Sequence, residues 1–323
     1  MRDKVSLLEE RDYYKPFSYP WAFEFYKRQQ QMHWLPDEVP LQDDIKDYKE
    51  KLTPANRALV DNIFRFFTQA DVDVCCGYAK HYLPTFKQPE IRMMLVSYAA
   101  MEAVHQEAYS LLLETLGKSE EEYKAFTEIQ AMAEKHEYLT DFNMRDKYEM
   151  AKTMAVYSGF TEGVQLFSSF AILLNFPRHN LMKGMGQIVT WSIRDETLHV
   201  EGMSKLFRTF IQENPEIWND KLKYEVYCAA ERVVELEDRF IDVCFENAEI
   251  EGLTPKEVKE YIRYIADRRL LGLGMKAIFH STDNPLPWLD QQINAVEHTN
   301  FFENRATEYA KASTQGNWQD IFK

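Results

Sequence analysis

The sequence contains few of the residues that interrupt helices. Only 11 glycines and 12 prolines occur among its 323 residues, whereas aromatic residues make up 14% of the chain and methionine occurs 13 times. Long helices with bulky cores are therefore expected rather than sheets. No linker-like stretch divides the chain, so we expect one helical domain over residues 1–305, with an N-terminal arm over residues 1 to about 50, and a flexible tail over 306–323.

The chain also lacks an excess of basic residues and any long apolar run. Its 52 Asp and Glu outnumber 38 Lys and Arg, for a formal net charge of −14, whereas nucleic-acid binding requires a basic footprint. No stretch reaches the roughly 18 uninterrupted apolar residues of a membrane span, and the N-terminus has no apolar signal region. We therefore expect a cytoplasmic protein that binds neither nucleic acid nor membrane.

Cysteine is scarce as well, and the four that occur are not spaced as metal ligands. Cys75 and Cys76 are adjacent, and neither pairs with Cys228 or Cys244 in a C-x-x-C motif. Adjacent thiols on a helix cannot easily face one zinc ion. We therefore expect four buried free thiols and no zinc site.

What the sequence does contain is a helical face that combines acid, imidazole and phenol. Glu102 and His105 stand three residues apart, and Tyr109 follows His105 by four, so all three project from one side of a helix. An unpaired charge directed into a core is costly, and a metal ion is the natural compensation. The positions that continue this face are apolar or aromatic: Leu95, Tyr98, Leu112 and Leu113.

The same spacing recurs farther along the chain. Glu196 and His199 repeat the Glu-x-x-His motif on a second face, which Val189 and Met203 continue. One such motif occurs by chance on many solvated helices, but two on separate apolar faces are far more specific. Ferritin-like dimetal-carboxylate bundles combine two Glu-x-x-His helices with one acid from each of two others. The sequence thus predicts an all-α, ferritin-like helical bundle with a dimetal-carboxylate site between four core helices.

Two further acids must complete such a site. Asp71 shares a face with Phe64, Phe67, Val74 and Tyr78, whereas Asp73 lies at a different angle, so Asp71 is the better inward acid. Glu162 is the fourth candidate, and the glycines at 159 and 163 that flank it indicate close packing or a ligand.

These acids lie on helices that the sequence outlines. A helix starting at Thr53-Pro54 is expected to extend to about residue 83, and residues 146–175 are expected to form one long helix. The intervals of 31 residues from Asp71 to Glu102 and 34 from Glu162 to Glu196 each suit a helix, a turn and a return on the neighbouring helix. Four carboxylates would be neutralised by two divalent cations, and oxygen with imidazole ligands favours iron or manganese.

At this point the chain resembles a known family, the small, radical-generating (R2-type) subunit of class I ribonucleotide reductase. The resemblance covers nearly the whole chain, and a generic ferritin-like protein lacks the Tyr109 position, the tryptophan arm and the tail. It rests on Trp34-Leu-Pro-Asp-Glu38, Asp71, Glu102-Ala-Val-His105, Tyr109, Glu162, Arg194-Asp-Glu-Thr-Leu-His199 and Asn300-Phe-Phe-Glu-x-Arg305.

This resemblance implies a function in a thioredoxin-dependent ribonucleoside-diphosphate reductase. A dinuclear centre, with Fe/Fe favoured and Mn/Mn or Mn/Fe as alternatives, would use O2 or a related oxidant to oxidise Tyr109. The implied metal ligands are Asp71, Glu102, His105, Glu162, Glu196 and His199.

The resemblance also implies a radical route and partners. The oxidising equivalent would pass from Tyr109 by way of His105, Asp195, Trp34 and Tyr309 to a large subunit that reduces ribonucleotides to deoxyribonucleotides. The apolar residues Trp318, Ile321 and Phe322 of the tail would dock on that subunit. A homodimer is expected, and a flavoprotein activase is a further candidate partner.

Other interpretations remain open from the sequence. The chain could be a related dimetal oxidase acting on a bound small molecule, or, less favoured, a helical interaction or metal-storage protein. Tyr109 could be an ordinary core tyrosine. Asp195 could orient a metal-bound imidazole or be a surface acid beside Arg194. The remaining histidines, His33, His81, His136, His179, His280 and His298, lack a suitably spaced acid and are not expected to bind metal.

Overall fold

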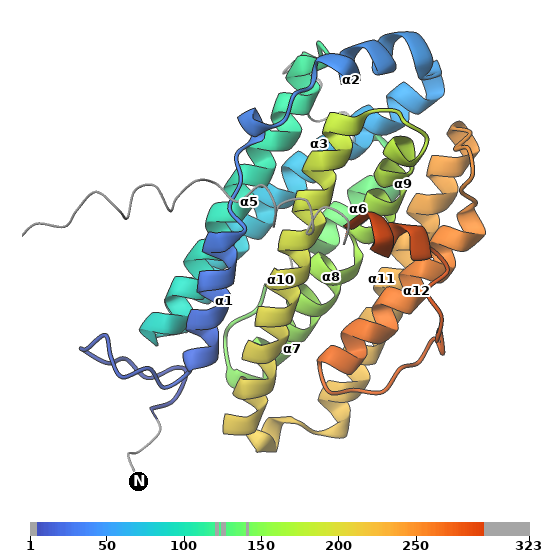
Figure 1. Cartoon of the computed structure of the whole chain (residues 1–323). Coiled ribbons are helices and arrows are strands. Elements are labelled where there is room, and N and C mark those ends of the chain that lie inside the picture. The colour runs from blue at the N-terminus through green and yellow to red at the C-terminus, as the bar shows by residue number, and fades with distance from the viewer. Residues whose placement is uncertain (1–4, 120–122, 124–126, 140–141, 294–323) are drawn as a thin grey trace, which may run out of the picture. The chain divides into compact units, whose positions relative to one another are not determined.

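The computed structural model describes residues 5–119, 123, 127–139 and 142–293, and these are predominantly helical, with no strand among them (Figure 1). This confirms the all-α prediction. No helix of this part is long and apolar enough to cross a membrane. The helices are α1 Pro20–Gln31, α2 Gln42–Lys46, α3 Pro54–Gly77, α4 Leu83–Thr85, α5 Pro89–Thr115, α6 Gln130–Leu139, α7 Lys147–Val156, α8 Glu162–Val164, α9 Phe167–Arg178, α10 Lys183–Glu213, α11 Asp220–Asn247 and α12 Pro255–Gly272.

The chain divides into two compact units, Met1–Leu286 and Pro287–Lys323, and every helix named above belongs to the first. The boundary expected at residues 305 and 306 lies outside the described residues.

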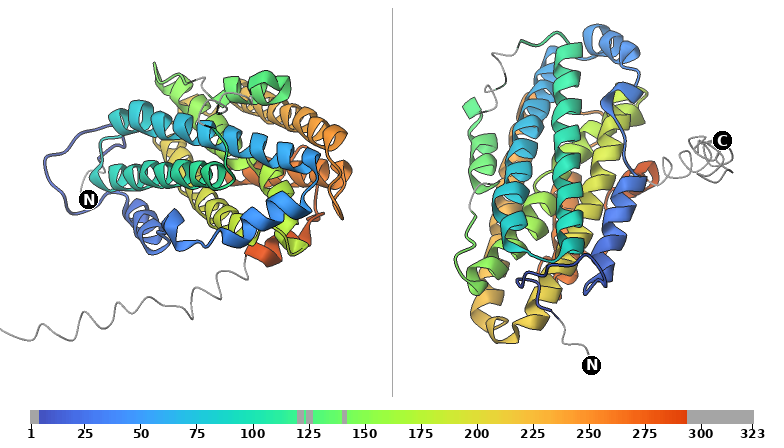
Figure 2. Two further views of the ribbon diagram at one scale, coloured as in Figure 1. Left: turned by 90° about the horizontal axis from the view of Figure 1, so that it is seen from above. Right: turned by 90° about the vertical axis from the view of Figure 1, so that its left-hand side faces the viewer.

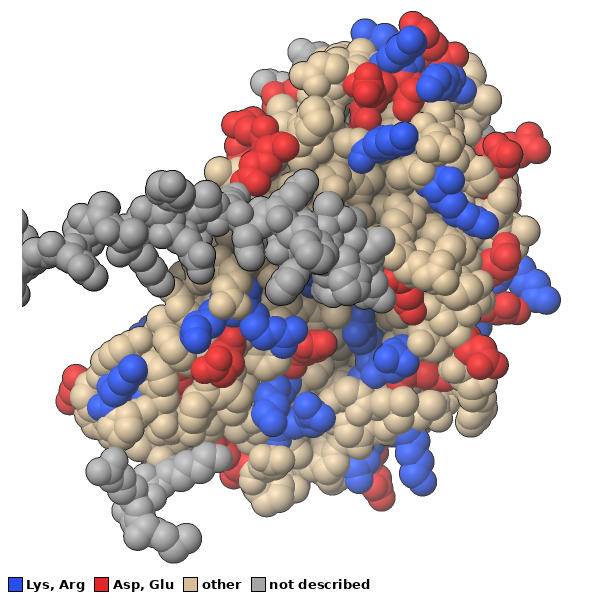
Figure 3. Space-filling model, in the orientation of Figure 1, with Lys and Arg blue, Asp and Glu red and all other residues tan. Residues whose placement is uncertain are grey.

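On the face shown in Figure 3, acidic and basic side chains are interspersed, so the net negative charge does not form one acidic patch there.

The core of the first unit is a bundle in which α3 packs along α5, and α10 packs on α5 and on α7 to α9 (Figure 1). Helix α1 lies against α5 and α10 at the edge of this bundle (Figure 2). Local signals start these helices where the sequence predicted. Thr53 accepts a hydrogen bond from the Asn56 amide at the start of α3, and Thr254 and Glu257 form a capping box at α12.

The expectation of one continuous helix over 146–175 is wrong. Helix α7 ends at Val156, a π-helical turn follows over Tyr157–Thr161, and α8 and α9 are separate segments. The glycines beside Glu162 allow close packing: Cβ atoms would come within 3.0 Å of Leu273 at position 159 and 2.9 Å of Arg269 at 163. The predicted close packing is thus present, and the π-turn re-aims the chain immediately before Glu162. The α3 helix likewise ends at Gly77 and continues as a π-turn.

The N-terminal arm is tied to the bundle by buried polar contacts. Arg11 forms an ion pair of 2.6 Å with Glu90, and the Tyr19 amide donates to the same carboxylate at 2.8 Å. At the other end of α1, the Arg194 guanidinium donates to the Met32 carbonyl at 2.6 Å. Helix α1 is therefore held at both ends against α5 and α10.

Candidate metal centre

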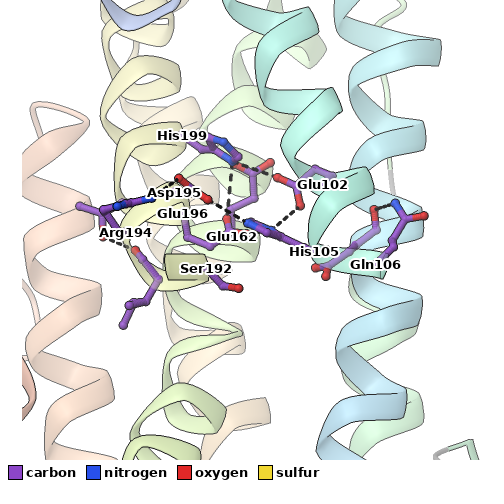
Figure 4. A network of polar contacts seen from close by, with 12 residues as sticks. Glu102, His105, Gln106, Glu162, Ser192, Arg194, Asp195, Glu196 and His199 are labelled. Carbon is purple, nitrogen blue, oxygen red and sulfur yellow. Dashed lines mark hydrogen bonds and ion pairs between the residues drawn. The ribbon is translucent and has the colours of Figure 1, made fainter. Parts of the chain in front are cut away.

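The structure brings all six candidate ligands together between four helices. Figure 4 labels all of them except Asp71. Asp71 comes from α3, Glu102 and His105 from α5, Glu162 from α8, and Glu196 and His199 from α10; all six are buried. They form two overlapping groups whose ligand atoms lie within 4.8 Å of one another: Asp71, Glu102, His105 and Glu196, and Glu162, Glu196 and His199. Because Glu196 belongs to both groups, the arrangement provides two adjacent positions for cations.

Both imidazoles direct the same nitrogen at the carboxylates. His105 Nδ1 lies 3.4 Å from Glu102 Oε2 and 3.4 Å from Glu196 Oε1. His199 Nδ1 lies 2.9 Å from Glu102 Oε1 and 3.9 Å from Glu196 Oε2. Glu102 therefore lies between the two imidazoles, with one oxygen turned toward each.

The donor atoms of this cluster fit a pair of hard divalent cations. Buried polar atoms are normally hydrogen-bonded, and a cluster of buried polar atoms without hydrogen bonds requires an explanation. Among the described residues, no Lys or Arg forms an ion pair with the four carboxylates. Carboxylate oxygens with imidazole nitrogens are the ligands that iron and manganese take. The buried ligand atoms without a hydrogen bond are Asp71 Oδ2, both oxygens of Glu102, Glu162 Oε1, Glu196 Oε2 and His199 Nδ1.

Burial and mutual repulsion make the metal-free cluster retain protons. Burial raises the pKa values of Asp71 and Glu162 well above their ordinary range, and the charges of neighbouring carboxylates add to the rise. For Glu102, burial also favours the neutral acid, but the adjoining imidazoles of His105 and His199 outweigh it and lower the pKa to about 2. Burial opposes the charge of His105, yet the nearby carboxylates of Asp195, Glu102 and Glu196 raise its pKa. A cation entering the site would displace protons.

Asp195 lies behind His105, as the imidazole-orienting interpretation expects. Its Oδ2 is 3.2 Å from His105 Nε2 and accepts a 2.8 Å hydrogen bond from Trp34 Nε1. Asp195 is fully buried, so it is not a surface acid. The Trp34 ring also stacks on His105 with centroids 5.9 Å apart, and it lies tilted against Trp191 with centroids 5.1 Å apart. His105, Asp195 and Trp34 therefore form a continuous chain of contacts.

Gln29 completes this network, and the sequence analysis missed it. Its amide donates to Asp195 Oδ1 at 3.1 Å, and its carbonyl oxygen lies 3.1 Å from His199 Nε2. The only local signal is a run of three glutamines in α1, of which periodicity singles out none. Its role depends on how α1 docks.

Tyr109 lies in an aromatic pocket beside the cluster. Its side chain is buried, with ring centroids 4.8 Å from Phe67 and 6.2 Å from Phe64, and Phe67 in turn contacts Phe170 at 5.0 Å. The hydroxyl has no hydrogen bond. Burial, followed by the charge of Asp71, raises its pKa, so the phenol stays protonated. Phe64 and Phe67 therefore line the pocket of Tyr109, and Phe170 adjoins it through Phe67.

Two other tyrosines, to which the sequence analysis assigned no role in the site, contact the candidate ligands. Tyr78 donates a 3.0 Å hydrogen bond to Glu162 Oε2, and the Tyr98 ring lies 4.3 Å from that of His199. A side chain at Gly202 would overlap the Tyr98 hydroxyl, so glycine is required there. Both tyrosines continue the faces of Asp71 and Glu102, which is the signal that could have identified them.

The remaining candidates contribute less. Tyr309 and the tail residues 317–323 lie outside the described residues. Apart from His298, which is also outside them, the other histidines belong to neither ligand group, and His136 instead contacts Asp73 at 2.7 Å. All four cysteines are free, but the expectation that all are buried is wrong. Only Cys244 is buried, because the other three lie on helix faces that are partly exposed.

The fold and this carboxylate–histidine cluster define a ferritin-like dimetal-carboxylate bundle. The model of the family "Ribonucleotide reductase, small chain" matches residues 11–285, and the chain therefore belongs to that family. As a ribonucleoside-diphosphate reductase small subunit it is part of an oxidoreductase and partners a large subunit, which confirms the function expected from the resemblance.

Known relatives agree over nearly the full length. A probable ribonucleoside-diphosphate reductase small subunit of Invertebrate iridescent virus 6 is 47% identical, covering 98% of this chain and 99% of the relative. The Chlamydia pneumoniae subunit beta is 33% identical, covering 92% and 89%.

Solved structures share the fold. A putative class I ribonucleotide reductase from Bacillus halodurans matches with a TM-score of 0.79 and 22% identity, covering 84% of this chain and 99% of that one. The dimanganese(II) NrdF of Streptococcus sanguinis matches with a TM-score of 0.75 and 22% identity, covering 87% and 100%. At this identity the likeness concerns the fold alone.

Proposed function

We propose that the six clustered residues hold two metal ions and that Tyr109 stores the oxidising equivalent made there. A bound pair, Fe/Fe in our preferred assignment and Mn/Mn or Mn/Fe as alternatives, would supply the oxidising power of O2 or a related oxidant. The observation that carries the proposal is the set of buried carboxylate oxygens with neither hydrogen bond nor cationic side chain, facing two imidazoles. The donor set is shared by iron and manganese.

Tyr109 is suited to hold an unpaired electron because its surroundings exclude water. The phenylalanine rings around it offer no proton donor or reductant. When a phenol is oxidised it must release its proton. Asp71, whose charge acts on this hydroxyl, is the proposed acceptor.

We propose that the oxidising equivalent leaves through His105, Asp195 and Trp34. The hydrogen bond from Trp34 Nε1 and the contact of His105 Nε2 with the same Asp195 oxygen support this route, because one carboxylate joins the indole to the imidazole. Tyr309 would be the next carrier toward the large subunit.

Replacing Tyr109 by phenylalanine tests the storage role. Wild-type protein loaded anaerobically with Fe2+, Mn2+ or both and then exposed to O2 should show two metals per chain and a tyrosyl EPR signal. The Tyr109→Phe variant should keep the metals and lose the signal. Tyr82→Phe is the control, since Tyr82 is also buried with an unbonded hydroxyl. Full turnover of Tyr109→Phe with the large subunit would refute radical storage on Tyr109.

The proposed docking of the C-terminal tail on the large subunit is tested separately. Replacing Trp318, Ile321 and Phe322 by alanine should leave metal content unchanged and weaken binding to the large subunit at least tenfold, because apolar anchors dominate such docking. Gln319→Ala is the matched polar control. Unchanged affinity in a pull-down or surface-binding titration would remove the docking role.

A further inference from the structure

The buried amide of Gln29 joins the surroundings of the two candidate metal-binding histidines. Only 1% of Gln29 is exposed, whereas its neighbours Gln30 and Gln31 are exposed. The amide nitrogen donates to Asp195 Oδ1, and the amide oxygen faces His199 Nε2, both at 3.1 Å. Asp195 in turn contacts His105 Nε2 at 3.2 Å. A continuous path therefore runs from one imidazole to the other.

The direction of each hydrogen bond in this path follows from the chemistry of its members. An ionised Asp195 carboxylate can only accept hydrogen bonds, and the Trp34 indole N–H, which can only donate, already donates to it. The amide nitrogen of Gln29 must therefore face Asp195, which leaves the amide oxygen to face His199. An oxygen can only accept, so His199 Nε2 carries the hydrogen.

The same tautomer, with the hydrogen on Nε2, follows for the rings of both His105 and His199. A neutral imidazole protonated at Nε2 has its lone pair on Nδ1. In both His105 and His199, Nδ1 is the nitrogen that faces the carboxylates. The Tyr98 ring holds His199 by its face at 4.3 Å, but a contact with a ring face leaves the tautomer open.

We propose that Gln29 is a positioning residue of the metal centre, which sets the tautomer and orientation of His199 and links this ring through Asp195 to His105. The inference rests on the proposed metal site and makes α1, an element of the N-terminal arm, part of that site. The arm is suited to this role because Arg11 and Tyr19 anchor it to Glu90 and because Met32 is bound by Arg194. Partners that orient metal-bound histidines typically change metal affinity by about 10- to 100-fold when they are lost.

Gln29→Leu removes both hydrogen bonds at nearly constant size, and Gln30→Leu is the matched control one residue away. In a chelator competition with Mn2+, Gln29→Leu should weaken the binding of at least one of the two ions by about 10- to 100-fold. Gln30→Leu should match the wild type. Equal affinities in Gln29→Leu and wild type, or an equal loss in both variants, would overturn the proposal.

A spectroscopic readout separates orientation from general stability. In 15N-histidine NMR of the full chain loaded with Zn2+, a diamagnetic probe, the wild type should show slowly exchanging Nε2–H signals for both rings. Gln29→Leu should lose the protected His199 signal. It should keep the His105 signal, because Asp195 still accepts the hydrogen bond from His105 Nε2. An unchanged His199 signal would refute the role of Gln29.

A second variant decides the matter if Gln29→Leu does not fold. Gln29→Glu keeps an oxygen acceptor for His199 but replaces the donor to Asp195 by a carboxylate. The folded protein should retain the protected His199 signal, and its loss would overturn the proposal. Failure of the wild type to bind two ions would instead refute the proposed metal site. This outcome is distinguishable from a failed role of Gln29, which shows only in the comparison of the variants with the wild type.

Discussion

Two glutamates in this bundle are equally buried but have opposite surroundings. Glu237, on α11, lies 2.6 Å from the Lys135 ammonium of α6 and accepts a hydrogen bond from Ser168. Glu162, on α8, accepts one hydrogen bond, from Tyr78, and its other oxygen has none. Both glutamates are completely shielded from solvent.

The difference separates a buried carboxylate that the chain itself neutralises from one that would bind a cation in the proposed metal site. Burial raises the pKa of both acids, but Lys135 and Ser168 oppose the rise at Glu237, whereas Glu196 and Glu102 add to it at Glu162. The first site is neutralised by the chain itself, and the Lys135 ammonium also lies 3.9 Å from the Phe240 ring centroid. In the proposed metal site, the charge of Glu162 would be neutralised by a bound cation.

Breaking the internal pair should have the largest effect. Lys135→Met leaves Glu237 buried without a counter-charge, which should lower the free energy of unfolding by about 3–5 kcal/mol. Arg239→Met, which breaks exposed pairs with Glu235 and Glu134, is the control and should leave the free energy of unfolding nearly unchanged. Chemical denaturation measures both. A loss below about 1 kcal/mol for Lys135→Met would contradict the structural role of the pair.

Removing charge from the open cluster should act in the opposite sense. Because the pKa of Glu162 is raised, its ionised form costs stability as pH rises, so Glu162→Gln should leave the metal-free protein at least as stable as the wild type. Mn2+ at 100 times its dissociation constant should stabilise the wild type by about 2.7 kcal/mol, and the variant should lose most of this gain. Denaturation with and without Mn2+, together with metal analysis, measures both terms. Retention of both ions by the variant would show that Glu162 is not a ligand.

A partly exposed pair should give the smallest effect. A hydrogen bond to Asp73 raises the pKa of His136, so protonated His136 stabilises the fold. This contribution is complete below about pH 6.5, the unfolded value, and disappears as pH rises through the raised folded value. His136→Gln should therefore cost up to about 1 kcal/mol at pH 6 and much less in alkaline solution. Unfolding titrations across this range test it, and a cost that grows with pH would contradict the assignment.

Much of the candidate site could be predicted because it depends on local periodicity. Glu102 with His105 and Glu196 with His199 lie on apolar helical faces, and spacing alone is enough to orient them inward. The choice of Asp71 over Asp73 followed from the same argument, and the structure agrees, since Asp73 instead faces His136.

What the sequence by itself determined about this protein is the helical class, the four acids and two histidines that face inward, and the family. Tertiary structure alone decided which of three glutamines enters the core, where the helix before Glu162 breaks, and that Lys135 meets Glu237. The physical reason is distance along the chain. Periodicity acts over a few residues of one helix, whereas Gln29 contacts residues more than 160 positions away, and such contacts exist only after the helices have packed.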